Sequence, residues 1–575
     1  MIGTNGRVTL GSMTRPFLLL LGLGLLYLLL ASLTTLWDRD EPRFARAAVE
    51  MVHTGDYLVP RFDGELRPDK PPMVYWWMIP WILMFGAVDL AVRVPSIIGS
   101  LIAATATFHI ARNLAGDRVA IRAMGIGGLM PLPLIIGTAA TADGLLLAGV
   151  SVALAILVDR ALHGSRTSHF PLLVIALAFA LLAKGPVGLV IFLLASATAS
   201  YWGRDSLQLG RDWWAKVGVA SLLAVTIFLC WGIPANEATD GELARVGIGR
   251  HLIQRSTEAL ESHGGDGILG WLLSLPFYLP ILLLGAAPGS ALLVPLVTRS
   301  KLLFKTRGQA VLIAALILPT LLLMTLVATK LPHYILAAFP GVAVAVALVW
   351  TRAEQGQLDE SALTGLSWQI GRRITALLLI SIPFLWAVAI QQGAGNLLHV
   401  VPVAVAFALS ALLTLAMKPG TALFGRRGLA GPVLATVTGI ALVAFGAGAM
   451  EQRWKVARPL AAAIEQSEAE GIAHSASITT LGYDEPSLVF ALDRDPAEGQ
   501  KTVPALHERF PDGISQWLAA GGPAWLLASV VELSRSGVDL EQQGCQLIWS
   551  TGPEGILNYS NGSTVSLQLW LLSGP

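Results

Sequence analysis

PFLLLLGLGLLYLLLASLTTLWDRDEPRFAR, from Pro16 to Arg46, joins a long apolar run to a dense cluster of charges. The run has the roughly 20 residues that a helix needs to cross the hydrocarbon core of a bilayer, and it is longer than a typical signal-peptide core. The charges follow at once, on a chain of which only 13% is charged. The stretch predicts a retained membrane-spanning helix that leads into an ionic segment at one membrane surface.

The composition of the whole chain fits this pattern. Of its 575 residues, 54% are hydrophobic, and the mean hydropathy is +0.64. Apolar runs of span length recur up to about residue 450, which predicts an α-helical polytopic membrane protein. The formal net charge of +1 gives no sign of a nucleic-acid partner. The two cysteines, Cys230 and Cys545, provide neither a disulfide framework nor a metal-ligand spacing.

Thirteen apolar segments are candidate membrane spans. They are residues 16–36, 95–113, 119–138, 142–159, 170–183, 186–202, 214–233, 270–296, 309–329, 332–350, 374–392, 398–417 and 429–449. A fourteenth segment, 73–88, reaches only ~24 Å as a helix at ~1.5 Å per residue. Because its Tyr75, Trp76, Trp77 and Trp81 favour the headgroup level, we interpret it as an interfacial helix.

The basic residues support thirteen spans and orient them. With this number, Lys and Arg gather in alternate connections, which the positive-inside rule assigns to the cytoplasm. The outer side then holds the segment 37–94, the connection with Asp143, the loop 234–269, the connection with Lys330 and everything after residue 450. We therefore expect the ionic chemistry of the chain at its outer membrane surface.

Cationic side chains on the outer side suit a lipid with a phosphate head group, because Lys and Arg bind phosphate by charge-assisted hydrogen bonds. Plainer roles stay open for some of them, namely ion pairs of a solvated loop for Arg43 and snorkelling from a span end for Lys330. The expected substrate-binding residues are Lys70, Arg255, Lys330, Tyr334, Glu41 and Arg43.

Two aspartates on the outer side, Asp40 and Asp143, are the expected catalytic residues. A carboxylate beside a phosphate-linked sugar can orient a hydroxyl or ammonium group, deprotonate an acceptor or stabilise positive charge at the anomeric carbon. A second interpretation of Asp143 stays open, since a carboxylate at the start of a helix can simply cap it.

A divalent metal ion such as Zn²⁺ is a further candidate ligand of the outer side. Asp69 and several histidines lie there, although their spacing matches no sharp metal motif. Asp69 and His251 are the expected metal ligands.

The tail, 451–575, differs from the rest of the chain. Its apolar stretches, among them ASITTL, AWLLASVV and TVSLQLWLL, are too short to span a bilayer and are separated by Gly, Pro and charged turns. They predict a small soluble α/β domain. We find no catalytic motif in it and expect it to serve as a lid or support.

Four motifs together resemble those of the bacterial lipid A aminoarabinose transferases of the ArnT type. They are DRDEPRFA (38–45), RPDKPP (67–72), the outer Asp143 and KLPHYILAAFP (330–340). That family consists of membrane glycosyltransferases with the GT-C fold and is related to the protein O-mannosyltransferases. The resemblance implies transfer of 4-amino-4-deoxy-L-arabinose, with inversion, from undecaprenyl phosphate to a lipid A phosphate. It implies a site on the periplasmic side of the inner membrane and resistance to polymyxin.

The resemblance also implies residue roles and domains. The two outer-loop aspartates of the family fall on Asp40 and Asp143, and its phosphate-binding Lys and Arg fall on Lys70 and Arg255. Residues 1–450 are expected to form the GT-C transmembrane domain with a periplasmic loop at 37–94, and 451–575 a periplasmic domain. The implied partners of a monomeric chain are the undecaprenyl-phosphate sugar donor, a lipid A acceptor and membrane lipids.

Two other functions stay open from the sequence. A chain with this pattern can use a polyprenyl-phosphate sugar to modify a protein or glycan, as O-mannosyltransferases do. It can also be a transporter, although carriers usually place polar groups near the membrane midplane, whereas the charges here lie at one surface.

The predicted topology is tested by cysteine labelling. A cysteine placed within 89–93 and another within 450–460 should both react with a membrane-impermeant maleimide added from outside, because both segments are expected on the outer side. Labelling at 89–93 only after the membrane is opened would show that 73–88 crosses the bilayer.

Overall fold

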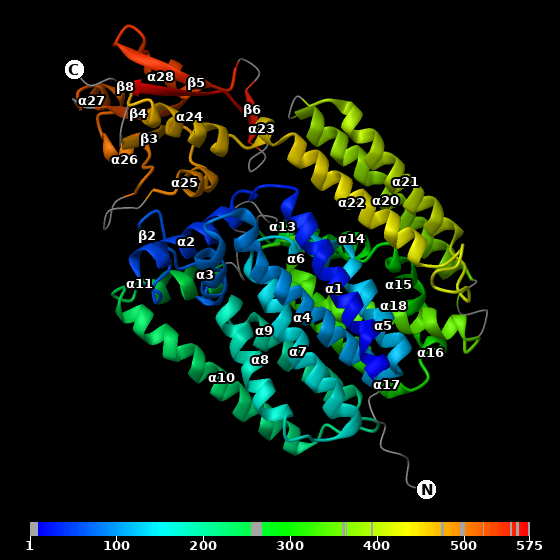
Figure 1. The fold of residues 1–575 in the computed structure, drawn as a ribbon. Coiled ribbons are helices and arrows are strands. Elements are labelled where there is room, and N and C mark those ends of the chain that lie inside the picture. Colours follow the sequence, from blue (N-terminus) through cyan, green and yellow to red (C-terminus); the bar gives the residue numbers. More distant parts are fainter. Residues whose placement is uncertain are drawn as a thin grey trace.

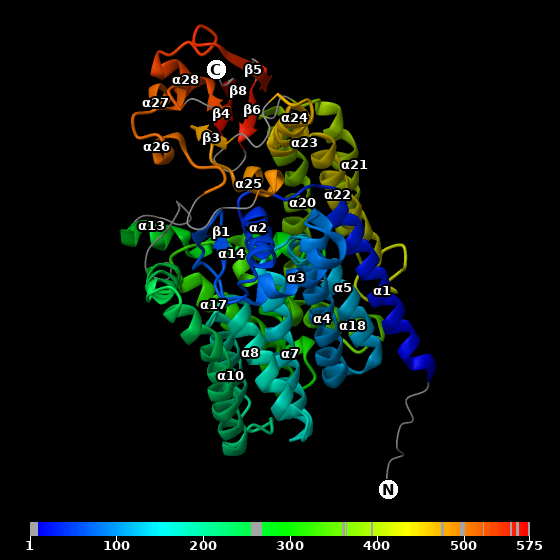
Figure 2. The same ribbon diagram turned by 60° about the vertical axis from the view of Figure 1, so that its left-hand side comes forward.

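The structure of the protein, a computed structural model, has a large helical bundle with a smaller module of strands and short helices stacked on one end (Figures 1 and 2). The residues it describes are 10–254, 267–358, 363, 365–392, 395–472, 477–494, 501–520, 523–552, 555–558 and 563–572.

Nine helical stretches of the described chain are long and apolar enough to cross a membrane. They are α1 (Leu10–Ser32), α4 (Asp89–Ala115), α7 (Ala142–His163), α10 (Arg211–Glu237), α17 (Arg307–Leu326), η4 with α18 (Pro332–Ala338 and Phe339–Glu354), α20 (Leu366–Gln392), η5 with α21 (Leu397–His399 and Val400–Ala416) and α22 (Ala430–Ala449). These stretches confirm a multi-pass α-helical membrane protein.

Two further apolar stretches are bent pairs of helices. The first joins α5 (Asp117–Leu129) to α6 (Pro131–Gly137) at 64°, and the second joins Leu269–Gly285 to Gly289–Thr298 at 118°. At the first bend Met130 is extended, because Pro131 disfavours a helical conformation in the residue before it. The second stretch contains α13 (Gly267–Ser274), η2 (Leu275–Phe277), α14 (Tyr278–Gly285), η3 (Gly289–Leu292) and α15 (Leu293–Thr298), with α16 (Ser300–Leu303) following.

Three apolar helices are shorter: α3 (Met73–Phe85), α8 (His169–Lys184) and α9 (Val187–Trp202). Each of the thirteen predicted spans thus falls on helix, and the segment 73–88 forms the short α3. By length, however, nine described stretches qualify as spans, or eleven if each bent pair crosses once. Because α8 and α9 have 16 residues each, they reach only ~24 Å. The number of thirteen spans stays a prediction.

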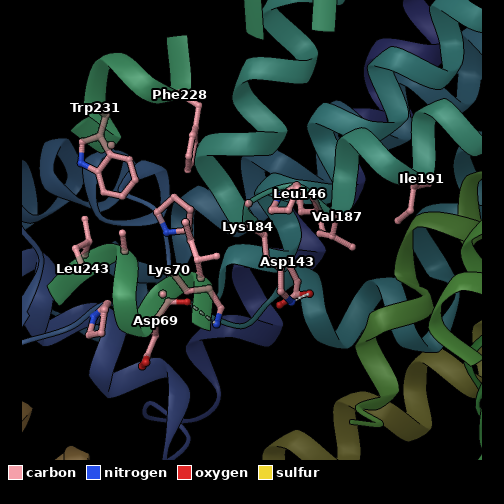
Figure 3. Close-up of a pocket in the computed structure, with 18 of the residues that line it drawn as sticks. Asp69, Lys70, Asp143, Leu146, Lys184, Val187, Ile191, Phe228, Trp231 and Leu243 are labelled. Atoms are coloured by element: carbon pink, nitrogen blue, oxygen red, sulfur yellow. Dashed lines mark hydrogen bonds and ion pairs between the residues drawn. The ribbon is translucent and has the colours of Figure 1, made fainter. Parts of the chain in front are cut away.

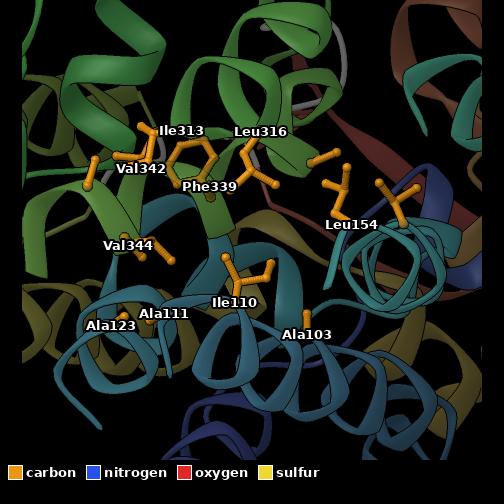
Figure 4. Packing of buried hydrophobic residues seen from close by; sticks show 14 of the residues in the cluster. Ala103, Ile110, Ala111, Ala123, Leu154, Ile313, Leu316, Phe339, Val342 and Val344 are labelled. Carbon is orange, nitrogen blue, oxygen red and sulfur yellow. The ribbon is translucent and has the colours of Figure 1, made fainter. Parts of the chain in front are cut away.

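The core of the bundle forms where α4, α5, α7, α17 and α18 pack together (Figure 4). Small residues let these helices approach closely. A Cβ atom on Gly99 of α4 would lie 2.5 Å from the backbone oxygen of Gly144 in α7, so the contact requires glycine. This contact fixes the first turn of α7, which carries Asp143, against α4.

Between α1 and α4 the chain forms α2 (Asp40–Thr54), the paired strands β1 (Arg61–Phe62) and β2 (Glu65–Leu66), and α3. A buried ion pair ties this segment to the bundle. Arg93 of α4 is 1% exposed and Glu41 of α2 is 2% exposed. The guanidinium donates to both carboxylate oxygens of Glu41, at 2.9 and 2.7 Å.

The environment of this pair satisfies its hydrogen-bonding groups. The remaining N–H groups of Arg93 donate to the backbone oxygens of Ala31, Thr34 and Thr35. Glu41 also accepts from the backbone N–H groups of Trp37 and Ala140. Burial by itself raises the pKa of Glu41, but the Arg93 guanidinium and the backbone N–H groups of Ala140 and Trp37 together outweigh it and hold that pKa below its usual value.

The C-terminal module contains one sheet of four strands in the order β3-β4-β8-β5, with β3 parallel to β4 and β8 antiparallel to both of its neighbours. Trp525 and Leu527 of β4 pack with Leu460 of α24 on one face, and Leu526 packs with Trp517 of α27 on the other. Burial on both faces explains the continuous apolar run of β4 and agrees with the α/β character predicted for the tail. The elements of the module and its approach are α23 (Glu451–Trp454), α24 (Ala457–Ala469), β3 (Ser477–Leu481), α25 (Pro486–Leu492), α26 (Leu506–Arg509), α27 (Ile514–Leu518), β4 (Ala524–Ser529), α28 (Val530–Ser536), β5 (Cys545–Ser550), β6 (Ile556–Asn558), β7 (Ser563–Val565) and β8 (Leu567–Leu572).

We predict that Arg93→Met lowers the free energy of unfolding by about 3–5 kcal/mol, because it leaves the Glu41 carboxylate buried without its partner. Since Arg93 holds the pKa of Glu41 low, the loss should be largest near neutral pH and should shrink as the pH falls through that pKa. Chemical unfolding of the purified protein in detergent measures it. The control is Arg118→Met, whose pair with Glu354 is largely exposed on the arginine side and should contribute about 0–1 kcal/mol. Equal losses would contradict the structural importance of the buried pair.

Candidate functional site

A cavity of about 480 Å³ lies where α7, α8, α9 and α10 meet the segment 68–71 (Figure 3). Its walls are mostly apolar and include Leu146 of α7, Ile191 of α9 and Phe228 of α10. The polar residues that line it are Asp69, Lys70, Asp143, Lys184, Asn236, Glu237, His333 and Tyr334. The cavity thus combines apolar walls with a charged group of side chains.

Asp143 is the centre of the charged group. It lies in the first turn of α7 and is 7% exposed. One carboxylate oxygen accepts from the Lys184 ammonium at 2.6 Å, and the other lies 3.7 Å from Nε2 of His333. We call Asp143, Lys184 and His333 the Asp143 cluster. Because its oxygens face these side chains and line the cavity, Asp143 is more than a helix cap.

The sequence analysis assigned neither Lys184 nor His333 of this cluster to the site. Lys184 ends α8 in the tight turn Lys184–Gly185–Pro186, and its ammonium lies 5.1 Å from the ring centroid of Tyr334. A signal was present, since the predicted topology places this turn on the outer side with the other site residues. A single lysine at a span end is, however, easily attributed to snorkelling.

Lys70 and Tyr334 line the cavity, where the sequence analysis expects substrate-binding residues. The Lys70 ammonium donates to the backbone oxygen of Asp69 at 3.1 Å, and its charge acts on Asp143. The Asp69 carboxylate pairs with Arg67 at 3.1 Å. Arg67 is itself buried, with its Nε donating to the Tyr75 hydroxyl at 3.2 Å, so the segment that carries Lys70 is held by a fixed cation.

Asp40 lies in the first turn of α2 and is exposed. It does not line the cavity itself, but its charge acts on Arg67 and Tyr75 and on His333 of the Asp143 cluster. Both predicted catalytic carboxylates therefore lie close enough to His333 to act on it electrostatically. Arg43 is half-buried on the same helix and does not line the cavity.

Glu41 and Lys330 are placed differently from the prediction that they bind substrate. Glu41 is enclosed in its pair with Arg93, because a buried carboxylate needs a cation and N–H donors. Lys330 is 3% exposed, and its ammonium donates to the backbone oxygens of Met324, Thr325 and Val327 at the end of α17. It satisfies a helix terminus and does not line the cavity.

The side chains of two further predicted residues, Arg255 and His251, lie outside the part of the chain that the structure describes. Arg255 lies outside the described residues. His251 falls in the helical turn Arg245–Gln254, beyond α11 (Glu242–Ala244), but its side chain is also outside the described part. Among the residues that the structure describes, no group of three or more His, Cys, Asp or Glu side chains is placed to hold a metal ion. A metal at Asp69 and His251 stays a prediction.

The part of the chain that carries this site is similar to known proteins. Residues 69–231, which include Lys70, Asp143 and Lys184, match a family model described as dolichyl-phosphate-mannose-protein mannosyltransferase. The undecaprenyl phosphate-alpha-4-amino-4-deoxy-L-arabinose arabinosyl transferase of Shewanella sediminis is 28% identical over 268 residues, 46% of this chain and 46% of that protein. Its counterpart in Aeromonas hydrophila is 27% identical over 328 residues, 56% of this chain and 57% of that protein. The chain spans about half the length of the curated relatives it matches.

A solved structure matches over nearly the whole chain. ArnT from Cupriavidus metallidurans, bound to undecaprenyl phosphate, aligns with a TM-score of 0.70 over 97% of this chain and 99% of that chain, at 19% identity. The chain therefore has the ArnT fold, and the GT-C architecture predicted from the four motifs is confirmed. The similarity to the aminoarabinose transferases that the motifs indicate is confirmed by the curated relatives.

Proposed function

We propose that the chain is an inverting glycosyltransferase that moves 4-amino-4-deoxy-L-arabinose from undecaprenyl phosphate to a lipid A phosphate, on the periplasmic side of the bacterial inner membrane. The single observation that carries this proposal is the cavity, whose apolar walls lead to Lys70 and the Asp143 cluster. The names of the matched relatives support the sugar and the carrier. Adding an amino sugar lowers the negative charge of lipid A and weakens its attraction for polymyxin and other cationic peptides.

The cavity suits a lipid-linked sugar because it has apolar walls at one end and charged side chains at the other. Leu146, Ile191 and Phe228 offer apolar contacts to the first part of a polyprenyl chain, and α10, which is largely unburied at the surface of the bundle, borders the cavity. At the other end lie the ammonium groups of Lys70 and Lys184 and the carboxylates of Asp143 and Asp69, which pair with Lys184 and Arg67. The two ammonium groups can donate charge-assisted hydrogen bonds to a phosphodiester, which carries one negative charge.

The proposed reaction is a direct displacement at the anomeric carbon. An oxygen of the lipid A phosphate forms the new bond while the bond to the carrier phosphate breaks, and the carrier phosphate leaves with the electron pair. Because the acceptor is already anionic near neutral pH, no strong base is needed. Asp40 and Asp143 then position the sugar and stabilise the developing positive charge, and the lysines stabilise the leaving phosphate.

A second function is favoured by one observation, the match of residues 69–231 to the protein mannosyltransferase model. If the acceptor were a protein hydroxyl, its proton would have to be removed as the glycosidic bond forms. The exposed Asp40 carboxylate, beside the charged end of the cavity, would then act as general base.

The roles of the site residues are tested by substitution. We predict that Asp40→Asn and Asp143→Asn each lower the turnover number about 100-fold, because they remove charge stabilisation from the transition state. Lys70→Ala should instead raise KM for the donor about tenfold, since it removes a charge-assisted contact to the phosphate. The measurement is transfer of labelled sugar to lipid A by purified protein in detergent.

A matched control separates chemistry from folding in this test. Asp143→Asn leaves the Lys184 ammonium without its carboxylate, so a folding defect is a rival explanation. The double variant Asp143→Asn/Lys184→Met removes both charges and should fold stably yet remain inactive. Recovery of near-normal turnover in the double variant would show that Asp143 serves only to neutralise Lys184.

The acceptor is tested in cells. Lipid A isolated from cells that express the protein and make the aminoarabinose donor should gain the mass of the amino sugar in mass spectrometry, and cells with the Asp143→Asn variant should not. Unmodified lipid A together with a newly glycosylated protein would favour the mannosyltransferase-like function.

A further inference from the structure

Helix α2 lies between the bundle and the C-terminal module (Figures 1 and 2). Its first turn carries Asp40, whose carboxylate has no hydrogen bond or ion pair to another described residue. The position of Asp40 relative to the Asp143 cluster is therefore set by the helix as a whole. What holds α2 in place consequently matters for the site.

Arg46 of α2 joins this helix directly to the C-terminal module. Its side chain is 0% exposed, which is rare for an arginine and requires that its N–H groups find partners. Nε donates to Glu50 of the same helix at 2.9 Å. One terminal nitrogen donates to the Asp493 carboxylate at 2.9 Å, and the other donates to the backbone oxygen of Arg494, both at the end of α25.

A second connection runs from the same face of α2 through the turn between β1 and β2. The Glu50 carboxylate accepts from the backbone N–H groups of Asp63 and Gly64, at 2.7 and 3.2 Å. The buried Asp63 carboxylate in turn accepts from the backbone N–H and the hydroxyl of Thr502, at 2.6 and 2.5 Å. Arg46 and Glu50 thus form the shared anchor of both connections.

Two positions along α2 have different anchors, one in its first turn and one near its middle. Glu41, at the start, is fixed to the bundle by Arg93, and Arg46, six residues after Asp40, is fixed to the module. At ~100° and ~1.5 Å per residue, Arg46 lies ~9 Å along the helix from Asp40 and ~240° around it, so the two side chains point to different sides. Loss of the Arg46 anchor would let the helix tilt or rotate about its first turn and move Asp40.

We propose that Arg46 is a positioning residue, through which docking of the C-terminal module sets the orientation of α2 and of the Asp40 carboxylate at the cavity. This inference rests on the proposed function, because it gives the module a role in the same transfer reaction. The module acts through α2 and contributes no group to the cavity lining among the described residues.

The first test compares two ion pairs that join the same two regions. Arg46→Met removes the anchor on α2, whereas Arg458→Met removes the pair between α24 of the module and Asp89 of α4. We expect Arg46→Met to lower kcat by about 10- to 100-fold with the donor KM unchanged, because a displaced reacting group slows the chemical step. Arg458→Met should keep kcat within about twofold, and Arg46→Lys should restore part of the loss.

Folding is controlled by a milder variant. Asp493→Asn leaves the buried Arg46–Glu50 pair intact and changes a side chain that is 47% exposed, so it should fold normally and still lower kcat. Equal kcat in Asp493→Asn, Arg46→Met and Arg458→Met would overturn the proposal. A loss of activity that equals the loss of folded protein in each variant would overturn it as well.

The second test does not depend on catalysis. Spin labels at Asp40→Cys and Ala238→Cys, in a chain with Cys230→Ala and Cys545→Ala, report the distance from α2 to the end of α10. Arg46→Met should broaden this distance distribution, and Arg458→Met should leave it narrow. Broadening together with an absence of sugar transfer by the wild-type protein would contradict the proposed function alone, whereas normal transfer by the wild-type protein without broadening would contradict the positioning role.

Discussion

The buried ion pair between Arg93 and Glu41 is the interaction on which the rest of the structure depends. Arg93 holds the chain after α1 through backbone oxygens, and Glu41 accepts the backbone N–H group of Ala140, just before α7. Asp40 precedes Glu41 in sequence, and Asp143 follows Ala140 by three residues. Besides the contacts between the two side chains, Arg93 donates three hydrogen bonds to backbone oxygens and Glu41 accepts two from backbone N–H groups, which stabilises the pair in spite of its burial. This one pair thus sets the places of both candidate catalytic carboxylates.

The arginines and the lysines around this pair make different kinds of contact. Arg46, Arg67 and Arg93 are buried and bind carboxylates, which suits the planar guanidinium group with its fixed donors. Lys70 and Lys184, whose ammonium groups are compact point charges on flexible stems, line the cavity. The arginines therefore hold the segments that carry the site, and the lysines face the space that the substrate would occupy.

Much of this arrangement was accessible from the sequence, because the bilayer limits the choices. Apolar runs predicted the helices, the aromatic segment 73–88 predicted a short helix, and the distribution of Lys and Arg predicted that Lys70, Asp143 and Tyr334 lie on one side of the membrane, where the structure brings them to one cavity. The topology placed Glu41 and Lys184 on the outer side but could not decide their roles, since a charged residue next to a span looks the same whether it binds a substrate, snorkels to the membrane surface or pairs with a buried partner. Only the three-dimensional pairing with Arg93 and Asp143 separates these cases.

The most direct measurement is photo-crosslinking with an undecaprenyl phosphate analogue that carries diazirines near the phosphate and along the chain. If the cavity holds the lipid carrier, mass spectrometry should find phosphate-end adducts at 68–71 and the first turn of α7, and chain adducts on Ile191 of α9 and Phe228 of α10. Excess undecaprenyl phosphate should suppress both. Adducts spread over the lipid-facing surfaces of α20 and α21, unaffected by competitor, would contradict a carrier site in the cavity.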